Sequence, residues 1–347
     1  MLTSDRPRSS RMNRVLPNIA LVVISFFLAG ALSEFVLRVR FGAPPAWTFP
    51  QESYLPDTEI GFRLKPGQHA FTHDQPVEIN SLGLRDRDYP RIPAPGVRRL
   101  LALGDSETFG NGLTLVDSWP KQLEYQLQRK GGAVAWEVVN AGLPGSATWQ
   151  HEVLARRISA ECVVQGLVLG FYVNDVVPMR VDRQAPQELT NTWSKRAAYL
   201  LKRSALLLSI WDALPLIRAW LSGEHDSWEE QILTGSPNRA IDAGWRQVEL
   251  SLESMKHFAD DRQMSFWLAA IPRRDQVAGV QAGRAYERRL AEICARLGIH
   301  FFDPLPPLES SYAEHGDHLF IPWDGHDTKL ANAVIARELA RLITEAG

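Results

Sequence analysis

The sequence predicts an α/β protein, a three-layer sandwich around a central parallel sheet, preceded by one transmembrane helix. Two observations predict the sandwich. From Arg98 onward, short apolar runs alternate with segments of helical spacing, and polar residues follow directly after those runs. Continuous apolar runs suit strands that are covered on both faces, as in parallel sheets. A third observation, an uncharged run near the N-terminus, predicts the transmembrane helix.

The N-terminal segment indicates the compartment. An uncharged run of 19 residues, 15–33, is close to the ~20 residues that cross a bilayer as a helix. Residues 35–37 prolong it, and four arginines precede it: Arg6, Arg8, Arg11 and Arg14. Since positive charge favours the cytoplasmic side, we expect residues 1–14 in the cytoplasm and residues 15–37 as the anchor. This predicts a single-pass protein of the cell inner membrane, with its body facing the periplasm or the outside.

A cleaved signal peptide is the alternative. Residues 29–31, Ala-Gly-Ala, resemble a signal-peptidase site. The apolar run is longer than the usual core of a signal peptide, which favours an uncleaved anchor. In both cases the body of the protein is exported.

Residues 38–97 are expected to form an extended approach on the surface of the main domain. Prolines interrupt any long helix there. They are Pro44, Pro45, Pro50, Pro56, Pro66, Pro76, Pro90, Pro93 and Pro95.

The main domain is expected over residues 98–345. Apolar runs predict strands, and helical spacing predicts the segments between them. The expected strands are 100–103, 136–139, 163–169, 266–271 and 300–302, and the expected helices are 119–129, 150–158, 245–258, 285–297 and 329–343.

A helical insertion is expected at about residues 176–244. Its middle, 197–221, is rich in Leu, Ile and Trp, but charged residues argue against a second membrane span. Two interpretations stay open. The insertion is either a helical hairpin packed on the domain, or a lid or membrane-facing element beside the active site.

Composition excludes several classes of function. The formal net charge is −2, so no basic field indicates nucleic-acid binding. Cys162 and Cys294 stand in apolar stretches and belong to no Cys/His cluster, so we expect buried hydrophobes, with a disulfide as the alternative. We expect no metal site and no cofactor. Nothing in the sequence identifies a protein partner.

The strongest chemical signal is the segment GDSETFG, residues 104–110, directly after the first core strand. In open α/β sheets, ligands bind at the carboxyl ends of the strands. Ser106 would stand there at the start of a helix, close to backbone N–H donors. The segment is not the G-x-S-x-G elbow, because Thr108 replaces the second glycine.

A serine nucleophile needs a base, and the segment WDGH, residues 323–326, offers one before the last helix. His326 could be held in one tautomer by Asp324 while its other nitrogen faces Ser106. His318, beside Asp317, is a competing candidate of similar composition.

Four separated blocks resemble those of the SGNH/GDSL hydrolase superfamily, in its membrane-anchored bacterial type. Ser106 matches the first block, NAGLPG (140–145) the second, FYVND (171–175) the third and DGH (324–326) the fourth. The resemblance implies a flavodoxin-like SGNH fold over residues 98–345. It also implies an oxyanion hole formed by the backbone N–H groups of Ser106 and Gly142 and the side-chain amide of Asn174.

Two departures from the family pattern matter. Tyr172 replaces the glycine expected two positions before Asn174, and the last block is D-x-H instead of D-x-x-H. The shorter spacing resembles polysaccharide O-acetyltransferases of the same fold. Residues 79–86, INSLGLRD, resemble a segment of single-span bacterial members. In it, Asn80 or Arg85 could reach the substrate, but a structural turn is the favoured interpretation.

These features predict a serine esterase that removes acyl groups, above all acetyl, from an extracytoplasmic glycan through an acyl-enzyme. One alternative is an O-acyltransferase that uses the same residues. Another is a non-catalytic, anchored glycan-binding protein, and a lipase-like activity also stays open because of the apolar insertion. The expected partners are an acylated carbohydrate or other ester substrate and the membrane.

Overall fold

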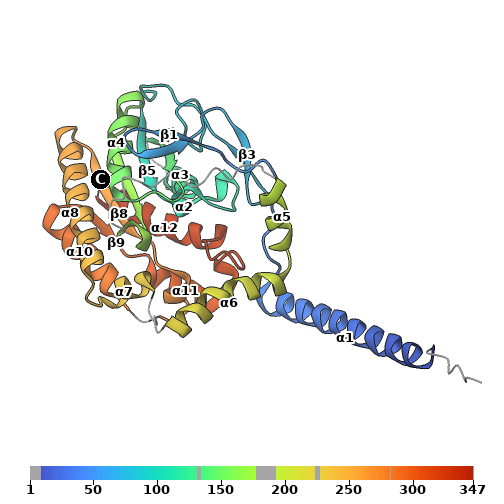
Figure 1. Cartoon of the computed structure of the whole chain (residues 1–347). Helices are drawn as coiled ribbons and strands as arrows, with labels where there is room; N and C mark the ends of the chain where they lie inside the picture. The colour runs from blue at the N-terminus through green and yellow to red at the C-terminus, as the bar shows by residue number, and fades with distance from the viewer. Residues whose placement is uncertain (1–8, 131–133, 177–192, 223–226, 282, 347) are drawn as a thin grey trace, which may run out of the picture.

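A five-stranded parallel sheet forms the centre of the protein (Figure 1). The computed structural model describes residues 9–130, 134–176, 193–222, 227–281 and 283–346. The strands lie in the order β6-β5-β7-β8-β9, which is the flavodoxin-like order 2-1-3-4-5 within the sheet. Their bounds are β5 Val97–Gly104, β6 Ala135–Gly142, β7 Gly166–Phe171, β8 Ser265–Ala270 and β9 His300–Phe302. The predicted fold class is therefore confirmed.

Helices cover both faces of the sheet and create two apolar cores. One face carries α4 (Thr148–Glu161), α8 (Arg239–Asp261) and α10 (Ala285–Leu297). The opposite face carries α3 (Trp119–Arg129), α11 (Leu305–His315) and α12 (Lys329–Ala346). The apolar strands recognised in the sequence are thus buried from both sides, as parallel strands require.

The expected strands and helices are present, and two of the bounds that differ have identifiable reasons. The third strand begins at Gly166 and not at residue 163, because the N–H of Val163 donates to Arg91 O (2.7 Å) outside the sheet. Helix α8 begins at Arg239, ahead of the expected residue 245. Its N-cap Asn238 accepts hydrogen bonds from the backbone N–H groups of Ala240 and Ile241. The expected end of the insertion at 244 therefore falls inside α8.

Residues 38–97 differ from the expected surface segment, because they form two antiparallel hairpins. The strands are β1 Tyr54–Asp57 and β2 Gly61–Leu64, then β3 His69–Thr72 and β4 Gln75–Glu78. Their side chains enter the core on the α4 side, where Ile60, Phe62 and Leu64 are almost fully buried. The prolines prevented helices, as expected, but the segment contributes to the core of the domain.

The segment INSLGLRD has a structural role. The Asn80 side chain accepts the N–H groups of Leu82 (3.0 Å) and Leu84 (2.9 Å), which closes the turn. The buried Arg85 guanidinium donates to the carbonyl oxygens of Phe109 (2.9 Å) and Gly110 (2.6 Å), at the end of the short helix that begins at Ser106. Neither Asn80 nor Arg85 lines the pocket that contains Ser106. The turn interpretation is therefore confirmed, with the addition that Arg85 clamps the loop that follows Ser106.

Helix α1 (Ser9–Phe41) projects away from the rest of the protein (Figure 1). Residues 17–41 are long and apolar enough to cross a membrane, and none of that stretch is buried. The helix continues through residues 29–31 and past residue 37. The anchor and the signal-peptide interpretations both stay predictions.

The described part of the insertion is helical. Its helices are α5 (Trp193–Leu201), α6 (Ala205–Ser222) and α7 (Trp228–Thr234), while residues 177–192 and 223–226 of the expected insertion lie outside the described residues. On α5, Tyr199 stacks on Trp47 with ring centres 4.3 Å apart. At the start of α6, Glu34 of α1 accepts hydrogen bonds from the backbone N–H groups of Ala205 (3.0 Å) and Leu206 (2.8 Å). The insertion thus contacts both the N-terminal segment and α1.

Both cysteines are buried and free. The Cys162 sulfur accepts a hydrogen bond from the Arg99 guanidinium (3.0 Å). The expectation of buried thiols is confirmed, and the alternative disulfide is absent.

Candidate active site

The turn that carries Ser106 joins β5 to the short helix α2 (Ser106–Phe109). Asp105 is the N-cap of this helix and accepts the N–H of Glu107 (3.0 Å). Gly104 has φ 149°, and a Cβ there would lie 2.0 Å from Thr108 Oγ1. Only glycine lets the helix approach the strand this closely. Ser106 therefore stands at the first position of a helix, where backbone N–H groups have no acceptor within the helix.

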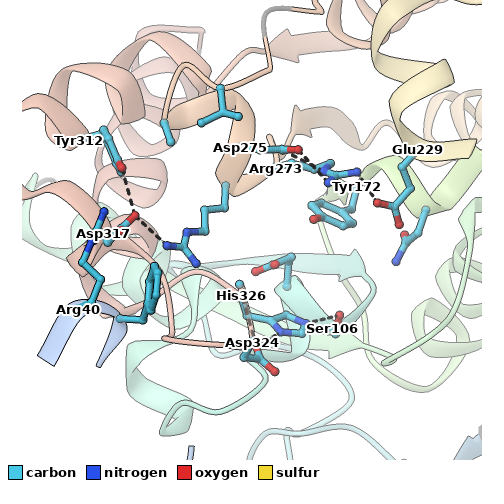
Figure 2. A pocket seen from close by; sticks show the side chains of 17 residues that line it. Arg40, Ser106, Tyr172, Glu229, Arg273, Asp275, Tyr312, Asp317, Asp324 and His326 are labelled. Atoms are coloured by element: carbon cyan, nitrogen blue, oxygen red, sulfur yellow. Dashed lines mark hydrogen bonds and ion pairs between the residues drawn. The ribbon is translucent and has the colours of Figure 1, made fainter. Parts of the chain in front are cut away.

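Ser106, His326 and Asp324 form a hydrogen-bonded chain (Figure 2). His326 Nε2 lies 2.9 Å from Ser106 Oγ, and Nδ1 is hydrogen-bonded to Asp324 Oδ1. Nδ1 of the imidazole is thus held by the Asp324 carboxylate, while Nε2 faces the Ser106 hydroxyl. His318 is exposed on another turn, so the structure selects His326 over His318.

The D-x-H spacing is explained by a tight loop after Ile321. The N–H groups of Asp324 (3.3 Å) and Gly325 (3.0 Å) donate to Ile321 O, and Ile321 N donates back to His326 O (2.8 Å). Asp324 Oδ1 also accepts the backbone N–H of His326 (3.2 Å). One loop therefore supplies both the base and its orienting carboxylate.

Asn174 follows β7 in the 3₁₀ turn Val173–Val176 and lines the same pocket as Ser106. Its Nδ2 donates to Asp105 Oδ2 (2.8 Å). An amide nitrogen carries two hydrogens, so one remains for an oxyanion. Asn174 is therefore placed as a candidate oxyanion donor, next to the cap of the nucleophile helix.

Gly142 does not agree with the role predicted for it. Its backbone N–H donates to Asn140 Oδ1 (3.0 Å), and the residue does not line the pocket. A Cβ at this position would lie 2.2 Å from Phe109 N. Only glycine fits at position 142, because α2 packs directly against β6 there. Its N–H is hydrogen-bonded to Asn140 and is therefore not free to bind an oxyanion. The motif NAGLPG drew attention to residues 140–145, but it could not show that the Gly142 N–H binds Asn140.

His73 is a site residue that the sequence did not reveal. It is buried in the β3–β4 turn, and its Nε2 lies 3.3 Å from Asp324 Oδ2, the carboxylate oxygen that His326 does not use. The Gln51 side chain binds both the N–H (3.2 Å) and the C=O (2.8 Å) of His73. The His73 backbone has φ 54°, and Gly112 leaves room for its ring, since a Cβ there would lie 2.6 Å from Nδ1. A histidine in a proline-rich segment, outside any recognised motif, carried no signal of this role.

The electrostatics of the site depend on buried carboxyl groups. Burial raises the pKa of Asp324, but its contacts with His326 and His73 outweigh burial and hold that pKa below its usual range. Burial also raises the pKa values of Glu107 and Asp327, which meet where Asp327 N donates to Glu107 Oε2 (3.3 Å). Burial lowers the pKa of His326, yet the charges of Glu107 and Asp324 outweigh it and raise the pKa to about 10. The protein therefore stabilises the imidazolium that forms when His326 takes a proton.

The pocket around the Ser106 hydroxyl has a volume of about 680 Å³ and a largely charged wall (Figure 2). Arg273 pairs with Glu229 and Asp275, and Arg274 lies 3.0 Å from Asp317. Tyr172, Tyr312, Ala278, Val280, Arg40 and Phe41 complete the rim beside the triad and Asn174. Tyr172, which replaces the family glycine, thus borders the catalytic pocket. Among the described residues, no cluster of His, Cys, Asp or Glu could hold a metal ion.

Comparison with known proteins gives structural neighbours only. No protein-family model matches the chain, and no curated protein does. The structure of TesA is 16% identical with a TM-score of 0.41, covering 70% of this chain and 97% of TesA. A lipolytic protein of the G-D-S-L family from Veillonella parvula is 12% identical (TM-score 0.41; 71% and 98% covered). The esterase EstA from Pseudoalteromonas sp. is 11% identical (TM-score 0.41; 72% and 97% covered). At these identities and TM-scores the function has to be argued from the site itself.

If His73 positions Asp324, replacing it should weaken turnover in proportion to one close polar contact with a charged group, the 3.3 Å approach of Nε2 to Oδ2. We expect His73→Phe to lower kcat about tenfold, the equivalent of ~1.5 kcal/mol, and His73→Gln, which keeps a side-chain N–H, to recover most of that loss. In an Asp324→Asn background, the effect of His73→Phe on kcat should nearly vanish, because the charged acceptor is gone. Steady-state kinetics of the single and double variants measure this. An undiminished effect in the double variant would show that His73 acts only through folding.

The pH profile should report the charge of Glu107. Catalysis needs neutral His326, so kcat/KM should rise with pH, and the midpoint of its acidic limb should lie above the ordinary histidine pKa of ~6.5. Removing a nearby negative charge destabilises the imidazolium, so Glu107→Gln should move this midpoint to lower pH. Glu314→Gln, an exposed carboxylate on α11, is the control and should leave the midpoint unchanged. A midpoint that stays in place in Glu107→Gln would contradict the electrostatic assignment.

Proposed function

We propose that this protein is a serine ester hydrolase of the SGNH/GDSL type that works through an acyl-enzyme. The observation that carries the proposal is the Ser106–His326–Asp324 chain at the carboxyl edge of the parallel sheet. A partly buried imidazole, held by a carboxylate and 2.9 Å from a serine hydroxyl, is the arrangement that activates serine as a nucleophile.

The chemistry follows from the positions of these groups. His326 Nε2 takes the proton of Ser106 as Oγ attacks the ester carbonyl carbon. The carbonyl oxygen becomes an oxyanion, for which the N–H of Ser106 and the second amide hydrogen of Asn174 are the candidate donors. Collapse releases the alcohol, which receives the proton from His326. A water molecule, deprotonated by the same imidazole, then frees the acyl group as a carboxylic acid.

For the substrate, we propose acyl esters, above all acetyl esters, of a glycan outside the cytoplasm. The charged and tyrosine-rich wall of the pocket supports a polar substrate, since such groups form hydrogen bonds with sugar hydroxyls. An open pocket of about 680 Å³ also has room for an acceptor alcohol in place of water. This favours O-acyl transfer as the second candidate. The assembled triad argues against the non-catalytic, glycan-binding alternative.

The topology that we propose has α1 spanning the inner membrane and the catalytic body on the periplasmic or outer side. The support is the arginine cluster at residues 6–14, the unburied apolar helix and the single stretch of this kind among the described residues.

The nucleophile is tested by covalent labelling. A fluorophosphonate probe should label the wild type, and Ser106→Ala should lose both labelling and esterase activity on p-nitrophenyl acetate, a loss on the order of 10⁶ in kcat. Ser310→Ala removes an exposed hydroxyl on α11 and should behave as the wild type. Retained labelling in a folded Ser106→Ala protein would refute the proposal. Mass spectrometry of an added oligosaccharide then separates transfer, which acetylates it, from hydrolysis, which does not.

The topology is tested by fusions at the C-terminus. We expect alkaline phosphatase to be active there, because it matures outside the cytoplasm, and a cytoplasmic fluorescent reporter to stay dark. The reverse pattern would place the body in the cytoplasm and remove the extracytoplasmic substrate.

A further inference from the structure

The corner between α5 and α6 is bound to the end of the proposed membrane span. Glu34 accepts hydrogen bonds from Ser204 Oγ (2.8 Å) and from the first two backbone N–H groups of α6, so it caps that helix. One turn further on, Arg38 donates to Arg203 O (2.6 Å). Glu34 lies three residues before the expected end of the span at residue 37, about 5 Å along a helix. The corner is therefore held at the level where α1 leaves the bilayer.

The two helices at this corner expose large apolar side chains. They are Trp193, Leu200 and Leu201 on α5 and Leu207, Ile210 and Trp211 on α6, hereafter the α5–α6 surface. Trp193 is 85% exposed and Trp211 65%. On α6, positions 207, 210 and 211 follow the spacing of a single helix face. A set of this size is unusual on a surface that contacts only water.

Two further observations indicate what covers this surface. Lys202 and the exposed Arg203 lie in the chain between the apolar residues of α5 and those of α6. On a bilayer, such basic side chains would contact the lipid headgroups while the apolar side chains contact the acyl chains. A cavity of about 430 Å³ lies between α1 and α6, walled by Phe26, Phe27 and Leu206. Because Phe26 and Phe27 belong to the proposed span, this cavity opens toward the hydrocarbon and not toward water.

We propose that the α5–α6 surface rests on the outer leaflet of the phospholipid bilayer that α1 spans. The bilayer is favoured over a second copy of this chain because the surface continues directly from the span through Glu34 and Arg38. Figure 1 shows the corner between α5 and α6 at the base of α1, where that helix leaves the body. Arg40 and Phe41, just past the span, line the catalytic pocket, so this docking holds the pocket mouth near the bilayer surface. The proposal rests on α1 being a span and not on the esterase activity.

The test measures the depth of a spin label in the full chain, reconstituted in nanodiscs of phosphatidylcholine and phosphatidylglycerol. Labels are placed at Ile210→Cys and, separately, at Leu201→Cys, with Leu250→Cys on α8 as an equally exposed control (61%, as Leu201). The unsubstituted protein shows the background from Cys162 and Cys294, which are buried. We expect the first two labels to collide more often with oxygen, which concentrates in lipid, than with a water-soluble nickel chelate, and the control to show the reverse.

Two results would overturn the proposal. Labels at positions 210 and 201 that resemble the label at 250 would place the surface in water. If the spectrum were broadened by the label of a neighbouring chain, and if neither oxygen nor the nickel chelate reached the label, the surface would be an interface with another copy of the chain. Since neither readout needs turnover, loss of the proposed function in the Ser106→Ala protein would leave this test unaffected.

Discussion

The register of the parallel sheet is the constraint on which the site depends. Gly104 of β5 pairs with Gly142 of β6 and Gly170 of β7, so these three strands end on one line. The short helix α2 begins at that line and packs against it so closely that side chains at Gly104 and Gly142 would clash. Segments distant in sequence can then deliver a nucleophile, an amide and a base to one place, because parallel strands present their carboxyl ends together.

The N-terminal segment completes the site that the sheet begins. Arg85 holds the loop after the nucleophile helix, and His73 approaches the free oxygen of Asp324. His73 in turn packs against Trp47 (ring centres 4.4 Å apart), on which Tyr199 of α5 stacks. Asp324 is thus connected by direct contacts to the insertion, which itself contacts α1. The N-terminal segment and the insertion, which lie outside the α/β core, therefore contact the residues that hold Ser106 and Asp324 in place.

The end of α1 also belongs to the catalytic surroundings. Phe41 packs edge-on against Trp323 (5.7 Å between ring centres), and the Trp323 indole donates to Gly42 O (2.9 Å). Trp323 directly precedes Asp324 and adopts a left-handed conformation, φ 66°. The loop that carries Asp324 and His326 is therefore held in place by Phe41 and Gly42, which follow the proposed span. The end of the proposed span and the loop that holds Asp324 and His326 share these contacts.

Local pattern was enough to predict the fold class, the core strands and the meeting of Ser106, His326 and Asp324. Buried parallel strands have to be continuously apolar, and Ser106, Asp324 and His326 lie in compact motifs whose spacing is itself the chemical requirement. The hairpins at residues 54–78, the contact of His73 with Asp324, the Arg85 clamp and the engaged N–H of Gly142 could not be predicted in this way. Arg85 lies 24 residues from Phe109, and His73 and Asp324 are about 250 residues apart, so no local pattern shows that these groups meet. The hairpin partners and Asn140, which accepts the N–H of Gly142, are close in sequence, but local spacing does not show how their side chains pack against the sheet. Those assignments were decided only when tertiary packing brought the partners within hydrogen-bond distance.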